Sequence, residues 1–306
     1  MKAIQFSTYG DSSVLKLAEV EKPILKEDEV LVKLKATTVN PFDMKVRSGL
    51  MQKSSPVTFP FIPGSDLAGI VEAIGSKVTR LKNGDEVFGT TFGGTYAEYA
   101  AVKESLVALK PKSISYNDAV ALAVPINTAN TLLFEKGNLQ KNQRVLVHGA
   151  AGAVGNSIVQ LAKLAGAYVI GTASGAGVEL VKKSGADEVI DYKTQDFTKL
   201  VKNIDLVADT VGGETQLKSL EVIKKGGRLL SIVSALSSEL SEKAGVISLF
   251  VFSNPSYQKL DSGKQLVEEG KLKPGIARVM KLEDAAIAQD LVSNGGINGK
   301  IVLEIN

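Results

Sequence analysis

A glycine-rich turn, HGAAGAVG, occupies residues 148–155. It follows the apolar run RVLV (144–147) and leads into a segment whose apolar residues recur at helical spacing. Because most side chains in the turn are hydrogen or methyl, backbone N–H groups and the positive end of the helix can approach a pyrophosphate. The pattern indicates a dinucleotide site, and the alternative is a turn that only packs a helix on a sheet. The candidate contacts are Ala150, Ala151, Gly152, Ala153, Val154 and Gly155.

The chain contains almost no residues that could act as a thiolate or an imidazole. There is no cysteine, and His148 is the only histidine, so disulfides, thiolate nucleophiles and cysteine zinc sites are excluded together. A histidine at a strand end is more often a packed residue than a ligand, and one histidine cannot build a catalytic zinc site. We therefore expect no bound metal.

The turn lies in a region where apolar strands alternate with helical segments. The strands are expected within 167–174, 188–192, 205–211 and 227–233, after the run at 144–147. Alternation of this kind indicates right-handed crossovers and a parallel sheet that helices cover on both faces. The expected fold class is therefore α/β, with a doubly wound parallel sheet that carries the cofactor.

The first third of the chain has a different pattern. Short apolar or alternating runs, such as 30–40, 67–75 and 95–103, are separated by many glycines and prolines, which is typical of an irregular β-rich domain. We expect this domain over residues 1–120, completed by 270–306, with the nucleotide domain over 121–269 and a cleft between the two.

Composition narrows the partners. The 306 residues include 36 Lys plus Arg and 33 Asp plus Glu, a net charge of +3, which gives no electrostatic footprint for nucleic acid. No apolar run approaches the length of a membrane span, and the start, MKAIQFSTYG, lacks the apolar core of a signal peptide. We expect a cytoplasmic protein.

Several motifs in order resemble one family over nearly the whole chain. They are VNPFDMKVRSG (39–49), PGSDLAGIVEAIG (63–75), GDEVFG (84–89), GGTYAEY (93–99), HGAAGAVG, GADEVIDY (185–192) and GKIVLEI (299–305). The chain resembles zinc-free medium-chain dehydrogenases/reductases, close to the quinone oxidoreductases and the enone or alkenal reductases. The resemblance implies a GroES-like catalytic domain, a Rossmann cofactor domain and a homodimer. Zinc-dependent relatives carry a His-Glu pair after the Pro-Gly, whereas this chain has Ser65 and Asp66.

The expected cofactor is NADPH. NAD-specific folds place an acid at the end of the second strand, and here that end reads GTASGAG with no acid before Glu179. By resemblance, Ser174 and Tyr192 contact the adenosine phosphate region; the alternative for Tyr192 is a half-buried strand-end aromatic. Gly177 departs from the Lys or Asn of many relatives, so we expect a modest preference. The resemblance also assigns the cofactor contacts Thr172, Ala173, Thr210 and Val233.

The expected reaction is hydride transfer to a quinone or an α,β-unsaturated carbonyl, an electrophilic small molecule whose oxygen becomes negative. Lys45 matches the lysine of the related enone reductases and is expected to stabilise that oxygen; the alternative is a solvated surface lysine. By resemblance, Asn40 and Thr128 orient the nicotinamide, although Asn40 is equally typical of a turn before proline.

Asp66 is expected either to organise the floor of the site or to serve as a helix cap or turn acid. Phe42, Phe92 and Tyr96 are candidates for apolar walls around the acceptor. The alternative function is a non-catalytic NADPH-binding protein, of crystallin-like or regulatory type.

Overall fold

The computed structural model describes all residues from Met1 to Asn306, and they divide into two compact units. The first unit contains residues 1–124, 255–269 and 274–306, and the second contains 125–254 and 270–273. The helix at Tyr257–Glu268 (α8) therefore groups with the first unit, whereas the sequence pattern placed it in the second. Its packing supplies a reason, because the Arg80 guanidinium lies over the Tyr257 ring at 3.5 Å from the centroid.

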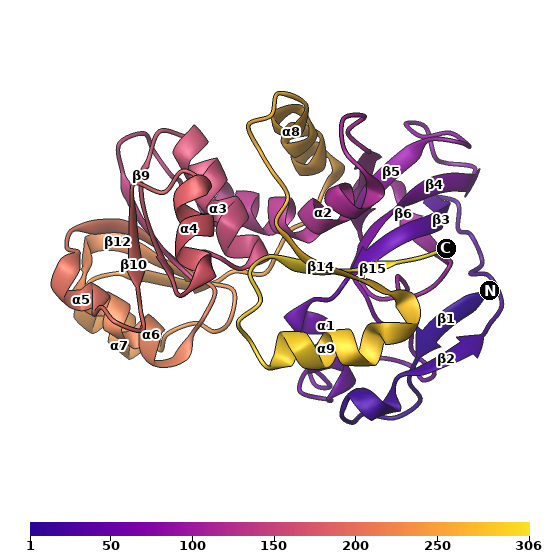
Figure 1. The fold of residues 1–306 in the computed structure, drawn as a ribbon, viewed down its shortest axis with the longest axis horizontal. Helices are drawn as coiled ribbons and strands as arrows, with labels where there is room; N and C mark the ends of the chain where they lie inside the picture. Colours follow the sequence, from indigo (N-terminus) through magenta and orange to yellow (C-terminus); the bar gives the residue numbers. More distant parts are fainter. The chain divides into compact units, whose positions relative to one another are not determined.

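The second unit is built on a six-stranded parallel sheet with the order β10-β9-β8-β11-β12-β13. Figure 1 labels its strands β9, β10 and β12. The strands are β8 (Arg144–His148), β9 (Tyr168–Ala173), β10 (Glu188–Asp191), β11 (Ile204–Asp209), β12 (Ile223–Ser231) and β13 (Ile247–Phe250). The strand order reverses between β8 and β11, which is the switch point where doubly wound sheets bind ligands. The predicted α/β class with a Rossmann sheet is confirmed.

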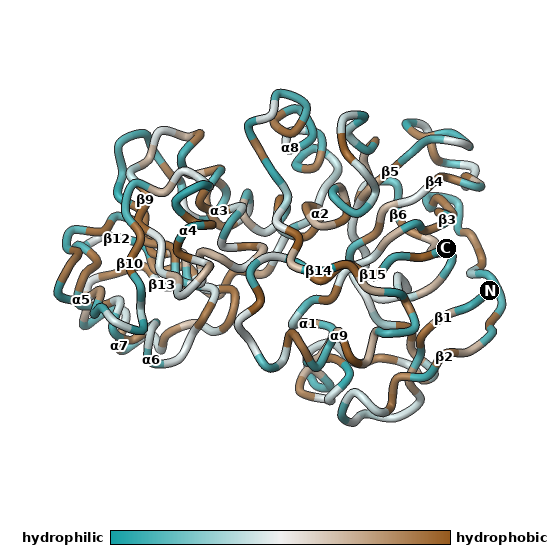
Figure 2. The backbone as a smooth tube through the Cα atoms, viewed as in Figure 1, coloured by the Kyte–Doolittle hydropathy of each residue, from teal (hydrophilic) through white to brown (hydrophobic).

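Helices connect these strands. They are α3 (Ala153–Leu164), α4 (Ala176–Lys183), α5 (Phe197–Leu200), α6 (Gly213–Lys218) and α7 (Ser238–Ala244). The strands they cover are apolar: β9 buries five of its six residues, and hydrophobic colour follows it in Figure 2. Burial on both faces explains why these strands have near-continuous apolar sequences.

The first unit contains a seven-stranded sheet with the order β14-β15-β3-β4-β5-β7, in which β6 also pairs with β3. Its strands are β3 (Glu29–Thr38), β4 (Asp66–Ile74), β5 (Glu86–Thr90), β6 (Tyr99–Lys103), β7 (Val107–Leu109), β14 (Ile276–Lys281) and β15 (Lys300–Glu304). A separate hairpin-like sheet pairs β1 (Lys2–Gln5) with β2 (Lys16–Glu19). The C-terminal strand β15 pairs with β3 in an antiparallel arrangement, so segments from the first and the last part of the sequence share one sheet.

The remaining helices are α1 (Pro41–Arg47), α2 (Tyr116–Asn130), α8 and α9 (Ala285–Ser293), with a π-helical turn at Thr131–Lys136 and short 3-10 turns at Ser12–Val14, Glu104–Leu106, Ser219–Glu221 and Leu282–Asp284. None of these helices combines the length and the apolar character that crossing a bilayer requires.

Candidate functional site

The glycine turn between β8 and α3 contains glycines with different tasks. Gly149 has a φ of +68°, a conformation that favours glycine, and a Cβ there would collide with the Thr210 hydroxyl. A Cβ on Gly155 would overlap the carbonyl oxygen of Gly149, so Gly155 allows α3 to pack against the turn. A Cβ on Gly152 would meet only that carbonyl oxygen, at 3.4 Å, which is ordinary contact. The space beside Gly152 is therefore open rather than filled by protein.

The start of α3 presents free backbone donors at this turn. Gly152 is the N-cap, and the first intrahelical bond runs from the Asn156 N–H to the Gly152 carbonyl at 2.8 Å. The N–H groups of Ala153, Val154 and Gly155 consequently have no acceptor within the helix. Aligned donors and the positive end of the helix dipole suit an anion such as a pyrophosphate.

The other residues predicted for the cofactor gather at the carboxyl edge of the same sheet, because parallel strands all end on one side. Thr172 and Ala173 end β9, and residues just beyond the neighbouring strand ends are Ser174, Tyr192, Thr210 and Val233. The Ser174 hydroxyl donates to the Tyr192 hydroxyl at 2.9 Å. Tyr192 is 58% exposed.

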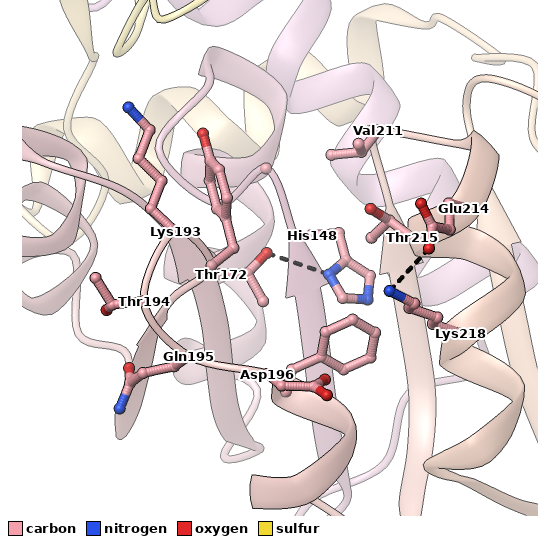
Figure 3. A pocket seen from close by; sticks show the side chains of 13 residues that line it. His148, Thr172, Lys193, Thr194, Gln195, Asp196, Val211, Glu214, Thr215 and Lys218 are labelled. Atoms are coloured by element: carbon pink, nitrogen blue, oxygen red, sulfur yellow. Dashed lines mark hydrogen bonds and ion pairs between the residues drawn. The ribbon is translucent and has the colours of Figure 1, made fainter.

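A pocket of about 670 Å³ opens at this edge (Figure 3). Of the residues predicted from sequence, Thr172 and Tyr192 line it, whereas Ser174, Thr210 and Val233 do not. His148 and Gly149 of the glycine turn also line it. The remaining lining residues were not predicted from the sequence; they come from the loop after β10, the start of α5, the segment just after β11 and α6, and they are Lys193, Thr194, Gln195, Asp196, Phe197, Val211, Glu214, Thr215 and Lys218. Lys193 to Asp196 follow the GADEVIDY motif, and Glu214, Thr215 and Lys218 lie in α6. Neither group has a sequence pattern of its own, so only the strand order could have placed them at this pocket.

Figure 3 shows how charges surround this pocket. The Lys218 ammonium is paired with the Glu214 carboxylate at 2.8 Å, on α6. Lys193 lies on the opposite loop and extends away from His148 in the view. Its ammonium has no ion-pair or hydrogen-bond partner within the chain, so one free positive charge borders the pocket.

His148 is a packed residue, as its sequence position suggested. It is fully buried; Nδ1 lies 3.1 Å from the Thr172 hydroxyl, Nε2 lies 2.9 Å from the Ser219 hydroxyl, and the ring packs edge-on against Phe197. Burial lowers the pKa of His148 from its ordinary 6.5 to about 4, although the nearby Asp209 carboxylate acts in the opposite direction. The imidazole is therefore neutral at pH 7.

We expect His148 to make the folded state sensitive to acid. Between pH 6.5 and about 4 the unfolded chain binds a proton at His148 that the folded chain does not, so the free energy of unfolding falls as the pH falls. The loss approaches about 3 kcal/mol from this residue. Urea unfolding of wild type and His148→Gln at several pH values tests this, since the variant should lack the contribution. Equal pH slopes in the two proteins would contradict it.

The first unit contains a buried polar cluster around Asn40. Asn40 precedes α1 and is 6% exposed; its Nδ2 donates to Asp66 Oδ2 at 2.8 Å. Asp66 begins β4, is fully buried and also accepts from the Thr38 hydroxyl and, at 2.6 Å, from the Val124 N–H. Asp66 therefore lies in a strand and not at a helix N-cap, and it is the acceptor shared by the members of this cluster.

Lys300, which sequence reasoning missed, completes this cluster. The ammonium is 2.9 Å from Asp66 Oδ2 and donates to Asn40 Oδ1 at 2.5 Å and to the Thr38 hydroxyl at 2.9 Å. Only the closing motif GKIVLEI pointed to this lysine, and a lysine in a C-terminal strand gives no sign of its own burial.

A second buried carboxyl, Asp43, lies next to the cluster. It accepts from the Asn40 N–H at 2.9 Å, and the hydroxyls of Tyr96 and Ser65 donate to it at 3.4 and 3.3 Å. Burial raises the pKa of Asp43 to about 7, against the opposing effects of its hydrogen bonds and of Lys300. Tyr96 is fully buried, whereas Phe92 is 52% exposed and packs edge-on against Phe42.

Neither Lys45 nor Thr128 forms a hydrogen bond with a member of this cluster. Lys45 lies in the last turn of α1, is half-buried, and its ammonium has no hydrogen-bond or ion-pair partner in the chain. Thr128 lies on α2 in the second unit and is 5% exposed. The side chains also form no group of three or more that could hold a metal ion.

Comparisons with known proteins agree with this geometry. Residues 26–112 match the profile of the alcohol dehydrogenase GroES-like domain, and residues 184–303 match a profile described as zinc-binding dehydrogenase. This chain has no cysteine and one histidine, so it lacks the ligands of a cysteine zinc site.

Individual proteins align over nearly the whole chain. The 2-methylene-furan-3-one reductase of Solanum lycopersicum is 37% identical over 99% of this chain and 79% of its own length, and the quinone oxidoreductase of Mus musculus is 32% identical over 99% and 97%. The structure of the quinone oxidoreductase from Coxiella burnetii superimposes with a TM-score of 0.92 at 30% identity, covering 100% of this chain and 99% of that one. The chain therefore belongs to the zinc-free medium-chain dehydrogenases/reductases of the quinone oxidoreductase type and is an oxidoreductase.

Proposed function

We propose that this protein is an NADPH-dependent reductase of α,β-unsaturated carbonyls or quinones. The observation that carries the proposal is the open glycine turn at Gly152, beside free helix N–H groups, on a sheet whose second strand is followed by Ser174 and not by an acid. The structure of the Escherichia coli quinone oxidoreductase complexed with NADPH, which has a TM-score of 0.89 at 27% identity over the full length of both chains, supports a nicotinamide cofactor.

The residues of the second unit fit this cofactor. We assign the pyrophosphate to the N–H groups at the start of α3, because they lack acceptors and the space beside Gly152 is open. We assign the adenosine half to the pocket at the carboxyl edge, with its 2′-phosphate near Ser174 and Tyr192. Thr172, Ala173, Thr210 and Val233 remain proposed contacts, and Thr128 is proposed to orient the nicotinamide.

The residues of the first unit are assigned to the reaction. When bound, NADPH would supply the hydride. Reduction of an enone places negative charge on the carbonyl oxygen, and a proton must follow. The Lys45 ammonium is unpaired, so it is available both to stabilise that oxygen and to provide the proton. Asn40, with its amide held in one orientation, is proposed to align the reacting groups.

Transfer of an isotope tests the function directly. Incubation of the protein with 4-deuterated NADPH and a panel of enones and quinones is expected to yield reduced products, with one deuterium carried on carbon in the case of enones. Mass spectrometry detects the label, and stopped-flow absorbance follows NADPH oxidation. Binding of NADPH without turnover of any acceptor would favour the non-catalytic alternative.

NADPH is expected to bind about tenfold more tightly than NADH, which is roughly 1.4 kcal/mol. The 2′-phosphate meets hydroxyl donors at Ser174 and Tyr192 and no carboxylate. Isothermal titration calorimetry with both cofactors measures this preference. Ser174→Asp should reverse it, because the new carboxylate repels the phosphate and accepts from the ribose 2′-hydroxyl. Equal affinities in the wild type would remove the basis for assigning NADPH.

We propose further that the protein is a homodimer assembled through β13. This strand ends the sheet order, so one of its edges has unpaired backbone groups, and its exposed side chains include Ile247, Leu249 and Phe250. An apolar free edge favours pairing with a second copy. Sedimentation velocity is expected to give a dimer, which Leu249→Lys weakens. A wild type that stays monomeric at high micromolar concentration would contradict the proposal.

A further inference from the structure

We propose that Lys300 is a positioning residue that orients the side-chain amide of Asn40 for the reaction; this inference rests on the proposed function. The two residues are 260 positions apart in the sequence, and the pairing of β15 with β3 brings them together. The Val39 N–H donates to the Ile301 carbonyl at 3.1 Å, which anchors the register beside Lys300.

The Lys300 ammonium cannot take part in the reaction itself. It is 4% exposed, and its three N–H donors match three oxygen acceptors, on Thr38, Asn40 and Asp66. No donor remains for a substrate or cofactor oxygen. Its effect on the reaction must therefore pass through the residues that it holds.

Of the residues that Lys300 contacts, Asn40 has a side-chain amide that could adopt two orientations, which differ by half a turn. Its Oδ1 accepts from the Lys300 ammonium, and its Nδ2 donates to Asp66 Oδ2 at 2.8 Å. Rotating the amide by half a turn would set N–H donors against the ammonium and an oxygen against the carboxylate. Both contacts would become repulsive inside a buried site, where such contacts cost most. Lys300 and Asp66 together thus allow one orientation, and this decides which of the remaining hydrogen-bonding positions of Asn40 face a ligand.

Lys300 also holds the Asp66 carboxyl group, with its ammonium 2.9 Å from Asp66 Oδ2. Asp66 is fully buried, and the charged or titratable groups around it are Lys300 from β15, Asp43 from α1 and Tyr96 from the segment before β6. Of these, Lys300 alone is positive. Without the ammonium, the buried carboxyl groups of Asp66 and Asp43 would have no positive partner in the cluster, and the contacts that hold Asn40 would change.

The orientation of Asn40 can be observed without cofactor or substrate. In protein labelled with 15N-asparagine, the signal missing from Asn40→Ala identifies the Asn40 side-chain amide. Lys300→Met is expected to move this signal and to speed its hydrogen exchange by at least about tenfold. Lys110→Met is the matched control, because Lys110 is also a buried lysine of the first unit but donates to the carbonyls of Pro111 and Ile114. It should leave the Asn40 signal unchanged.

If Lys300→Met does not fold, the neutral pair Asp66→Asn with Lys300→Met removes both charges and permits the same measurement. An Asn40 signal that keeps its position and its protection in either folded variant overturns the inference, whatever the catalytic result.

Activity provides the second readout, through a double-mutant cycle. Lys300→Met is expected to lower kcat by about tenfold in the wild-type background and by less than about twofold in Asn40→Ala, with the Kd for NADPH changed little. Equal effects in both backgrounds would show that Lys300 does not act through Asn40 and would overturn the inference. A wild type with no turnover would instead refute the proposed function, and the amide signal would still decide the role of Lys300.

Discussion

Lys45→Ala is expected to lower kcat with enone acceptors by about one to three orders of magnitude, the range for lost oxyanion donors. The ammonium has no partner within the chain, so its charge is available to a developing enolate. Because the contact is stronger with an enolate than with a neutral carbonyl, its loss affects kcat more than KM. Steady-state kinetics with a saturating enone measures the effect, and titration calorimetry should show nearly unchanged NADPH affinity.

Two further variants separate charge from packing at this position. Lys45→Met keeps the stem without the charge and should behave like Lys45→Ala. Lys53→Ala removes an exposed lysine of the same unit and should leave kcat unchanged. If Lys45→Met and Lys45→Ala both keep full kcat, Lys45 is a surface residue and another group donates the proton. If Lys45→Met is active and Lys45→Ala is not, the side chain contributes to packing and not through its charge. Ortho-quinones should be less sensitive to either change.

Gly152→Val is expected to weaken NADPH binding by at least about 100-fold while the protein stays folded. Gly152 has φ −69° and ψ 164°, which valine adopts readily, and an added Cβ meets only the Gly149 carbonyl at 3.4 Å. The branched side chain would instead fill the space in which a pyrophosphate meets the start of α3. Calorimetric titration measures the affinity, and circular dichroism with thermal unfolding checks the fold.

Gly155 provides the contrasting control, three residues later in the same turn. A Cβ there would overlap the Gly149 carbonyl oxygen, so Gly155→Ala should lower Tm, whereas Gly152→Ala should not. A substitution at Gly152 would thus impair ligand binding, whereas a substitution at Gly155 would disrupt packing. A folded Gly152→Val that binds NADPH like the wild type would refute the pyrophosphate assignment.

Local patterns were sufficient to predict the second unit. Each strand from β8 to β12 is a short apolar run between helical segments, and such periodicity depends only on which faces are buried. Because parallel strands end on one edge, the sequence also predicts that residues after different strands, such as Ser174 and Tyr192, lie near one another, and the hydrogen bond between them agrees. The lack of cysteine excluded a cysteine zinc site without any structure.

Contacts between distant segments could be decided only by the tertiary structure. No local pattern indicates that Lys300 is buried against Asp66 and Asn40. Burial of a lysine depends on its partners, and here Asn40 lies 260 residues away in the sequence. The full burial of Tyr96, the lining of the pocket by Lys193 to Asp196 and the grouping of α8 with the first unit arise in the same way. Periodicity specifies which side of an element is buried, but the identity of the covering residues depends on how the sheets assemble.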